Sequence, residues 1–152
     1  MCLDANAPFA EALRHEDLRT EAEAATYRTT IWQVRADQGA VVDYSTFERA
    51  EAAGFPADAL VEDDHERCQA EAAWLKSHGM LGLLAPSAAL PGSLTLALFG
   101  PRVAISWDAI VELASTMPAA KLTTGPPPTG LVSRIRYFGE THAALVAYQS
   151  VR

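Results

Sequence analysis

Residues 8–14 read PFAEALR, and residues 83–89 read LLAPSAA. The first stretch places the carboxylate of Glu11 among strong helix formers. The second places the hydroxyl of Ser87 directly after a short apolar run that is typical of a buried strand. Neither stretch is informative alone, so the argument depends on their order along the chain and on the segments between them.

Three segments lie between Glu11 and Ser87. The first is residues 42–46 (VDYST), and the second is a helix-sized stretch that ends at Gly54. The third is residues 63–70 (DDHERCQA), which lead to Trp74. From about residue 2 to about residue 100 this order resembles the RES-domain family. The family is named for an arginine, a glutamate and a serine. Its characterised members are bacterial toxins that consume NAD and are held in check by a helix-turn-helix antitoxin.

The resemblance implies a toxin module that cleaves NAD, its substrate, at the nicotinamide–ribose bond by hydrolysis, phosphorolysis or ADP-ribosyl transfer. Glu11 is then the catalytic carboxylate, because breaking this bond builds positive charge on the ribose, which a carboxylate stabilises. Ser87 is expected to bind NAD or shape its pocket, since no histidine is placed by the sequence to activate a serine nucleophile. Arg14, one turn after Glu11, and Gln69 are the other candidate NAD-binding residues.

The family's arginine has no counterpart in this chain, because the family carries it in an N-terminal part that would precede Met1. The resemblance therefore implies an N-terminally truncated domain. Cys2 stands where the family often has a tyrosine. The alternative, from a different class of function, is a non-catalytic remnant or interaction domain that binds an antitoxin-type partner.

Each candidate residue also has a structural explanation. Glu11 is expected in the first turn of a helix, where the helix dipole favours a carboxylate without any catalytic role. Arg14 has the pattern of an exposed helix cation, and Ser87 follows a proline in a common turn pair.

A length of 152 residues with 49% hydrophobic residues predicts one globular domain. The net charge of −7 argues against direct binding to nucleic acid, since such proteins concentrate Lys and Arg. No apolar run approaches the roughly 18 residues of a membrane span, and no signal peptide is evident. The sequence therefore predicts a soluble, cytoplasmic protein with no membrane partner.

No metal cofactor is expected. Cys2 and Cys68 lack metal-ligand spacing and are expected to be reduced. Residues 63–66 (DDHE) point in different directions around a helix start, which favours helix capping over a metal site. Three histidines are predicted to be exposed and are not candidate ligands: His15, His78 and His142. Neither a G-x-G-x-x-G nor a Walker pattern occurs, which disfavours a Rossmann or P-loop nucleotide site.

The fold class predicted is α+β, with the small mixed sheets and flanking helices of ADP-ribosyltransferase-like proteins. Asn6 is expected to cap a helix that runs to about Ala25. Residues 29–36 and 40–44 are expected to form a strand, turn and strand. Two further helices are expected to end at Gly54 and Gly79, the second capped by Asp63 and with Trp74 in the core. Further strands are predicted at residues 81–85, 94–99 and 103–107.

Three regions are predicted: a partial RES-like domain at residues 1–108, a Pro-rich linker region at 109–130, and a C-terminal helical tail at 131–152. Residues 123–130 (TTGPPPTG) are the part of the linker least compatible with a helix or an interior strand. The tail has apolar residues available for packing, at Leu131, Ile135, Phe138 and Leu145. The sequence leaves open whether this tail folds back on the domain or contacts a partner.

Overall fold

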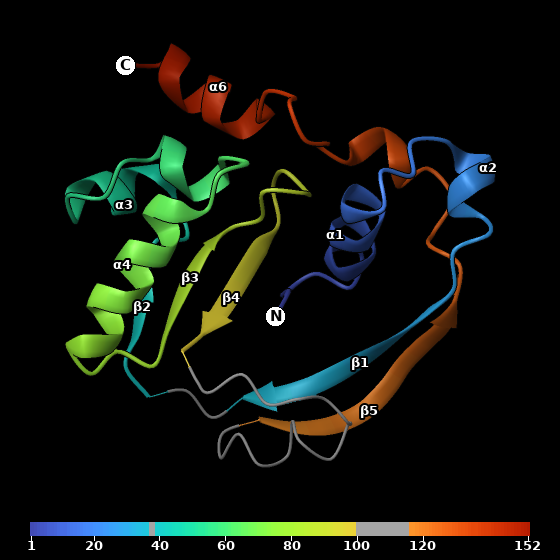
Figure 1. Ribbon diagram of the computed structural model, residues 1–152, viewed down its shortest axis with the longest axis horizontal. Coiled ribbons are helices and arrows are strands. Elements are labelled where there is room, and N and C mark those ends of the chain that lie inside the picture. The colour runs from blue at the N-terminus through green and yellow to red at the C-terminus, as the bar shows by residue number, and fades with distance from the viewer. Residues whose placement is uncertain (37–38, 100–115) are drawn as a thin grey trace.

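A computed structural model describes residues 1–36, 39–99 and 116–152 (Figure 1). A three-stranded sheet contains β2 (Val41–Asp43), β3 (Gly82–Pro86) and β4 (Leu94–Leu98), with β3 in the middle. A separate two-stranded antiparallel sheet pairs β1 (Thr29–Ala36) with β5 (Thr116–Gly125). Helices flank these small mixed sheets, so the predicted α+β class is confirmed.

The expected hairpin between residues 29–36 and 40–44 is wrong. β2 instead runs parallel to β3, with Val42 opposite Leu83, and β1 pairs with β5. This pairing buries Leu83 in a core that Val42 also contacts. β3 continues antiparallel into β4, so the two strands on either side of residues 87–93 are sheet neighbours.

Strand β5 extends into the segment that was predicted to be an extended linker. Thr123, Thr124 and Gly125 pair with Ile31, Thr30 and Thr29 of β1. Within the described residues this sheet has two strands, which places β5 at its edge. The prolines at 126–128 follow only after the last residue of β5. The strand predicted at 103–107 lies outside the described residues, and the division into three regions stays a prediction.

The N-terminal helix is shorter than predicted. α1 spans Ala7–His15, and a second short helix, α2, spans Glu21–Ala24. The break comes at Asp17, whose backbone φ of 53° is left-handed, and Thr20 then starts α2 with a capping box. The Asn6 side chain does not cap α1; instead the Asp4 carboxylate accepts a hydrogen bond from the Asn6 N–H at 2.7 Å.

The two later helices form close to their predicted positions. In α3 (Phe47–Ala52) the Thr46 side chain accepts a hydrogen bond from the Arg49 N–H, and α4 spans Glu66–Ser77. Gly54 and Gly79 follow these helices with φ of 86° and 82°, conformations that favour glycine.

Two details of α4 differ from the prediction. Asp63 does not cap the helix, because its N-cap position is His65 and the carboxylate of Asp64 accepts the hydrogen bond from the Glu66 N–H. Trp74, expected in the core, is 54% exposed, and Leu75 is the buried residue of this helix.

Among the described residues, the buried hydrophobic side chains form two clusters. In Figure 1, α1 lies on the β4 side of the three-stranded sheet, whereas α3 and α4 lie on the β2 side. The first cluster joins α1 to the turn after β3 and to the tail; its buried members are Ala7, Phe9, Ala10, Leu13, Ala24, Ala89, Leu90, Leu131, Ile135 and Tyr137. The second joins β2 and β3 to α3, α4 and the short 3-10 helix Asp58–Val61.

The C-terminal tail folds back on the domain. It contains a 3-10 turn, Val132–Arg134, and helix α6, Ala143–Ser150. Leu131 and Ile135 are buried in the first cluster, whereas Leu145 packs against the second. Phe138 is 40% exposed. In the described part of the chain, no helix is long and apolar enough to cross a membrane.

We expect Ile135→Ala, which truncates a side chain that is 7% exposed, to lower the free energy of unfolding by about 2–4 kcal/mol, because a buried Ile leaves a cavity when shortened. Val151→Ala, at a position that is 82% exposed in the same tail, is the matched control. It should change the free energy of unfolding by less than about 0.5 kcal/mol. Urea unfolding measures both. Equal stability of the two variants would contradict the packing of the tail described above.

Candidate functional site

The structure brings together the two residues on which the sequence argument rests. The Ser87 hydroxyl donates a hydrogen bond to Glu11 Oε1 at 3.2 Å, across 76 residues of sequence. Ser87 is 1% exposed, and Glu11 is half-buried. Glu11 was predicted to lie in the first turn of its helix. Because α1 begins at Ala7, Glu11 lies in the second turn, where the helix dipole stabilises a carboxylate less.

The turn between β3 and β4 fixes the direction of the Ser87 side chain. The Ser87 N–H donates to the Ser93 carbonyl at 2.9 Å, which closes the turn. The Leu90 N–H donates to Ser87 Oγ at 3.1 Å, so the hydroxyl proton is free to point toward Glu11. The Ser87 hydroxyl is therefore held from both sides.

His142, which was predicted to be exposed, is 3% exposed and belongs to this site. Its Nε2 lies 3.1 Å from the Ser87 carbonyl oxygen, and its Nδ1 accepts from the Leu145 N–H at 3.3 Å. This pair of partners fits the neutral ring with the proton on Nε2. Burial, with the nearby charges of Arg136 and Arg14, lowers the His142 pKa. No local pattern in the sequence marks His142 for this role, because its partner Ser87 is 55 residues away.

Arg14 is also buried, at 2% exposure, and is not the exposed helix cation that its pattern suggests. Its Nη2 lies 2.6 Å from Asp63 Oδ1, and its guanidinium lies 4.2 Å from the centre of the Phe138 ring. Burial and the charge of Arg136 lower the pKa of Arg14, while Glu11 and Asp63 act in the opposite direction. The cation next to Glu11 is therefore already paired.

Asp63 holds two arginines together. Arg136 Nη1 lies 2.9 Å from Asp63 Oδ1, without the alignment of a hydrogen bond, and the Gly139 N–H donates to Oδ2 at 2.6 Å. Partial burial acts to raise the Asp63 pKa, but the Gly139 hydrogen bond and the two guanidinium charges outweigh it and lower the pKa. Asp63 thus stays ionised. Through it the segment just before α4 is joined to Arg14 of α1 and to Arg136 and Gly139 of the tail.

The remaining candidate, Gln69, lies on an exposed part of α4. Within the described residues its side chain makes no hydrogen bond to Glu11 or Ser87, so the structure does not bring it into their cluster.

Further polar groups lie along β4 and the segment beside it. Cys2 pairs with Thr95 through an isolated antiparallel bridge, and burial, followed by the charge of Glu11, raises the pKa of its thiol. Ser93 Oγ is buried and has no hydrogen-bond partner in the described part of the chain, and Thr95 Oγ1 is buried beside the Cys2 thiol. A buried hydroxyl without a partner is unusual in a folded protein.

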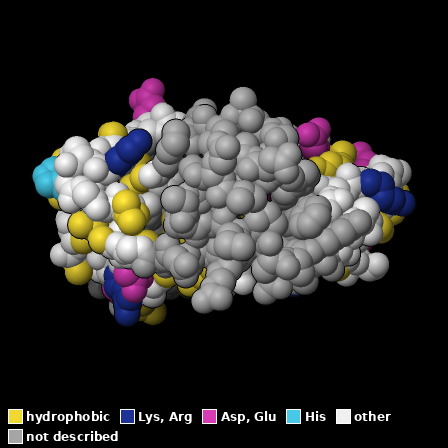
Figure 2. All heavy atoms as spheres, turned by 90° about the horizontal axis from the view of Figure 1, so that it is seen from below, with side chains coloured by type: hydrophobic (Ala, Val, Ile, Leu, Met, Phe, Trp, Pro, Cys, Tyr) yellow, Lys and Arg dark blue, Asp and Glu magenta, His cyan; other side chains and the backbone are white. Residues whose placement is uncertain are grey.

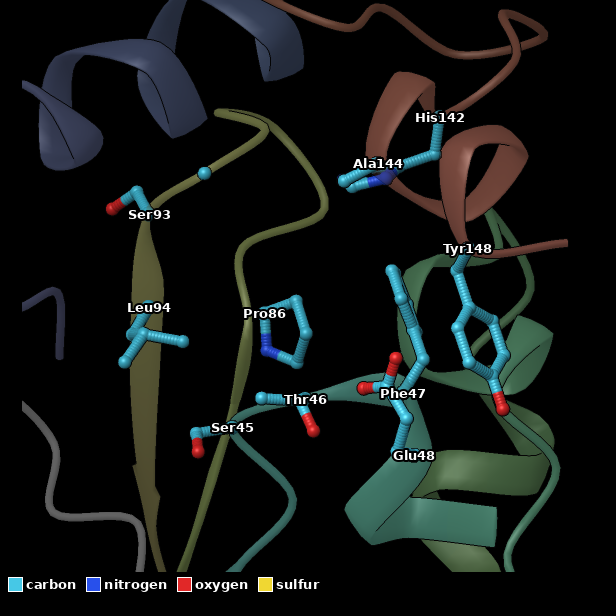
Figure 3. Close-up of a pocket in the computed structure, with 11 residues that line it drawn as sticks. Ser45, Thr46, Phe47, Glu48, Pro86, Ser93, Leu94, His142, Ala144 and Tyr148 are labelled. Carbon is cyan, nitrogen blue, oxygen red and sulfur yellow. The ribbon is translucent and has the colours of Figure 1, made fainter. Parts of the chain in front are cut away.

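A cavity of about 310 Å³ opens between the start of β4, α3 and α6 (Figure 3). Phe47, Tyr148 and Pro86 supply its apolar surface, and the ring of His142 reaches toward it from the start of α6. Its other lining residues are Ser45, Thr46, Glu48, Gly92, Ser93, Leu94 and Ala144. Glu11, Arg14 and Ser87 do not line this cavity. Pro86, Gly92 and Ser93, which lie next to Ser87 or in the same turn, do line it.

A family model for the RES domain matches residues 2–118. The chain belongs to the RES-domain family. The match includes Glu11, Arg14, Asp63 and Ser87 of this RES domain but not the segment that carries His142. Neither the curated proteins nor the solved structures contain a match to the chain.

Charged side chains on one face of this RES domain are mixed in sign. Where the chain is described on the face in Figure 2, Lys and Arg lie apart from one another, with Asp, Glu and hydrophobic side chains also present. Among the described residues, no group of three or more His, Cys, Asp or Glu side chains could hold a metal ion.

Asp63→Asn should destabilise the RES domain by about 1.5–3 kcal/mol, the range for hydrogen bonds to charged groups, because it leaves two buried guanidiniums without their counter-charge. Asp58→Asn removes a surface ion pair with Arg67 at 2.8 Å and should have a much smaller effect. Chemical denaturation of both variants measures the difference. A cost for Asp63→Asn no larger than for Asp58→Asn would contradict a structural role for the buried cluster.

Stability should fall as the pH drops below about 6.5, the usual pKa of histidine. Because the folded-state pKa of His142 is lowered, the unfolded chain binds more protons between that lowered value and 6.5, so the folded state loses stability in this window. Above about pH 6.5 the contribution of His142 to the free energy of unfolding is constant. We expect His142→Asn to show a shallower decline than the unsubstituted chain in denaturation at several pH values, and equal slopes would contradict the burial of a neutral ring.

Proposed function

We propose that this RES domain is a toxin-type module that binds NAD and breaks its nicotinamide–ribose bond, with Glu11 as the catalytic carboxylate. The observation that carries the proposal is the hydrogen bond between Ser87 Oγ and Glu11 Oε1 in a chain of this family. Since NAD is an intracellular metabolite, the proposal includes a cytoplasmic location and a toxin–antitoxin setting with a helix-turn-helix partner.

In the proposed reaction, the bond between ribose C1′ and the nicotinamide nitrogen breaks, and its electron pair leaves with nicotinamide. Positive charge develops on the ribose, and water, phosphate or a protein side chain supplies the electron pair of the new bond to C1′. The charge of Glu11 would stabilise this oxocarbenium-like state, and its Oε2 would accept a hydrogen bond from a ribose hydroxyl. No metal is needed for this step.

Ser87 would act by orienting Glu11. Its hydroxyl donates to Oε1 while accepting from the Leu90 N–H, so the carboxylate is held in one direction before the ligand arrives. The buried hydroxyl of Ser93 supports an adjoining polar region for the ligand. Arg14 would act on NAD through its positive charge, and Gln69 would contact NAD only where the ligand extends over α4.

The second candidate function is a non-catalytic interaction domain that binds an antitoxin-type partner. It is favoured by the engagement of Arg14, because a guanidinium paired with Asp63 at 2.6 Å is not free to grip a phosphate. Co-purification with a helix-turn-helix protein, in the absence of NAD turnover and unaffected by Glu11→Gln, would support this function over the first.

Glu11→Gln should lower the rate of NAD consumption by about 10²–10³-fold, because the amide keeps the shape of the side chain but loses the charge that stabilises the ribose cation. Glu16→Gln, at the exposed end of the same helix, is the matched control and should retain the full rate. Nicotinamide release followed by chromatography measures both. Equal rates for the two variants, or no release by the unsubstituted chain, would contradict the proposed reaction.

A further inference from the structure

We propose that His142 is a positioning residue of the Glu11–Ser87 site, so that the C-terminal segment 131–142 forms part of that site. The inference rests on the proposed function, and it extends the site beyond residues 2–118, the part of the chain that the family model matches. His142 would not touch NAD; it would act through the backbone of Ser87.

The segment 131–142 holds the turn after β3 at two carbonyl groups. His142 Nε2 lies 3.1 Å from the Ser87 carbonyl oxygen, and the Arg136 N–H donates to the Ala89 carbonyl at 2.9 Å. Ala88, which lies between these two carbonyl groups, is thereby fixed as well. The two contacts hold the backbone at Ser87 itself and two residues after it, directly beside the hydroxyl that binds Glu11.

The segment 131–142 is itself attached to the rest of the protein. The Gly139 N–H binds Asp63 at 2.6 Å, and the Tyr137 hydroxyl donates to the Leu18 carbonyl. Ile135 is buried in the first hydrophobic cluster. The segment is therefore attached to Leu18, three residues after α1, and to Asp63, three residues before α4, and these attachments let it hold Ser87 in place.

Contacts at both ring nitrogens hold the His142 ring in its orientation. Its Nδ1 accepts from the Leu145 N–H at the start of α6, and its plane meets the Phe47 ring edge-on, at 85° and 6.0 Å between centres. With Nδ1 occupied as an acceptor, the proton lies on Nε2 and points at the Ser87 carbonyl. Loss of this donor would leave a buried carbonyl without a partner and allow the turn to shift.

Two substitutions separate the two hydrogen bonds of His142. Asn places its side-chain oxygen near the position of Nδ1, so His142→Asn keeps the cap of α6 and removes the donor to Ser87. Gln places its amide nitrogen near the position of Nε2, so His142→Gln keeps the donor and loses the cap. A residue that only stabilises the fold would affect turnover in both variants in proportion to their loss of stability.

The experiment measures kcat and KM for NAD in both variants at a temperature where thermal unfolding shows each to be folded. We expect His142→Asn to lower kcat about tenfold to a hundredfold with a smaller change in KM, because a displaced Ser87 misorients Glu11. His142→Gln should retain most of kcat. Equal kcat values for the two variants, or a larger loss in His142→Gln, would overturn the proposal.

Hydrogen exchange of the Leu90 amide, which donates to Ser87 Oγ, provides a readout that does not depend on activity. If the unsubstituted chain does not consume NAD, the proposed function fails, and this exchange rate alone tests the positioning role. Faster exchange in His142→Asn than in His142→Gln supports it. The same rate in both variants overturns it.

Discussion

The arrangement of this RES domain depends on the burial of one serine whose polar groups are all satisfied. The Ser87 N–H binds Ser93 in its own turn, its carbonyl faces His142 of the tail, and its hydroxyl binds both Leu90 and Glu11. A buried polar group without a partner is costly, so these contacts depend on one another. Helix α1, the turn between β3 and β4, and the tail are therefore held in one arrangement by the same residue.

A second constraint is electrostatic and joins the same helix and tail. Arg14 and Arg136 share the carboxylate of Asp63, and both guanidiniums are almost completely buried. One carboxylate faces two cations, so the negative charge of nearby Glu11 also favours the charged form of Arg14. Glu11 thus has a stabilising electrostatic role beside the catalytic role we propose for it. The same cluster explains why a cation next to the site is not free to bind a phosphate.

Local signals in the sequence predicted much of the fold. The glycines after α3 and α4 and the apolar runs of β3 and β4 placed these elements to within a few residues. The partnership of Glu11 with Ser87 followed from the order of segments along the chain. The burial of Arg14 and His142 could not be predicted, because their partners are 49 and 55 residues away and carry no local pattern. The parallel pairing of β2 with β3 was missed for the same reason, since a short turn between two strands suggests a hairpin.

The most direct test of the central claim, that the Glu11–Ser87 pair forms an NAD site, is a titration of the isotopically labelled chain with ADP-ribose, followed through its backbone amide NMR signals. The account predicts that the largest shifts occur at Glu11, Ser87 and Leu90. Shifts confined to the cavity around Phe47 and Tyr148, or no shifts at all, would contradict it.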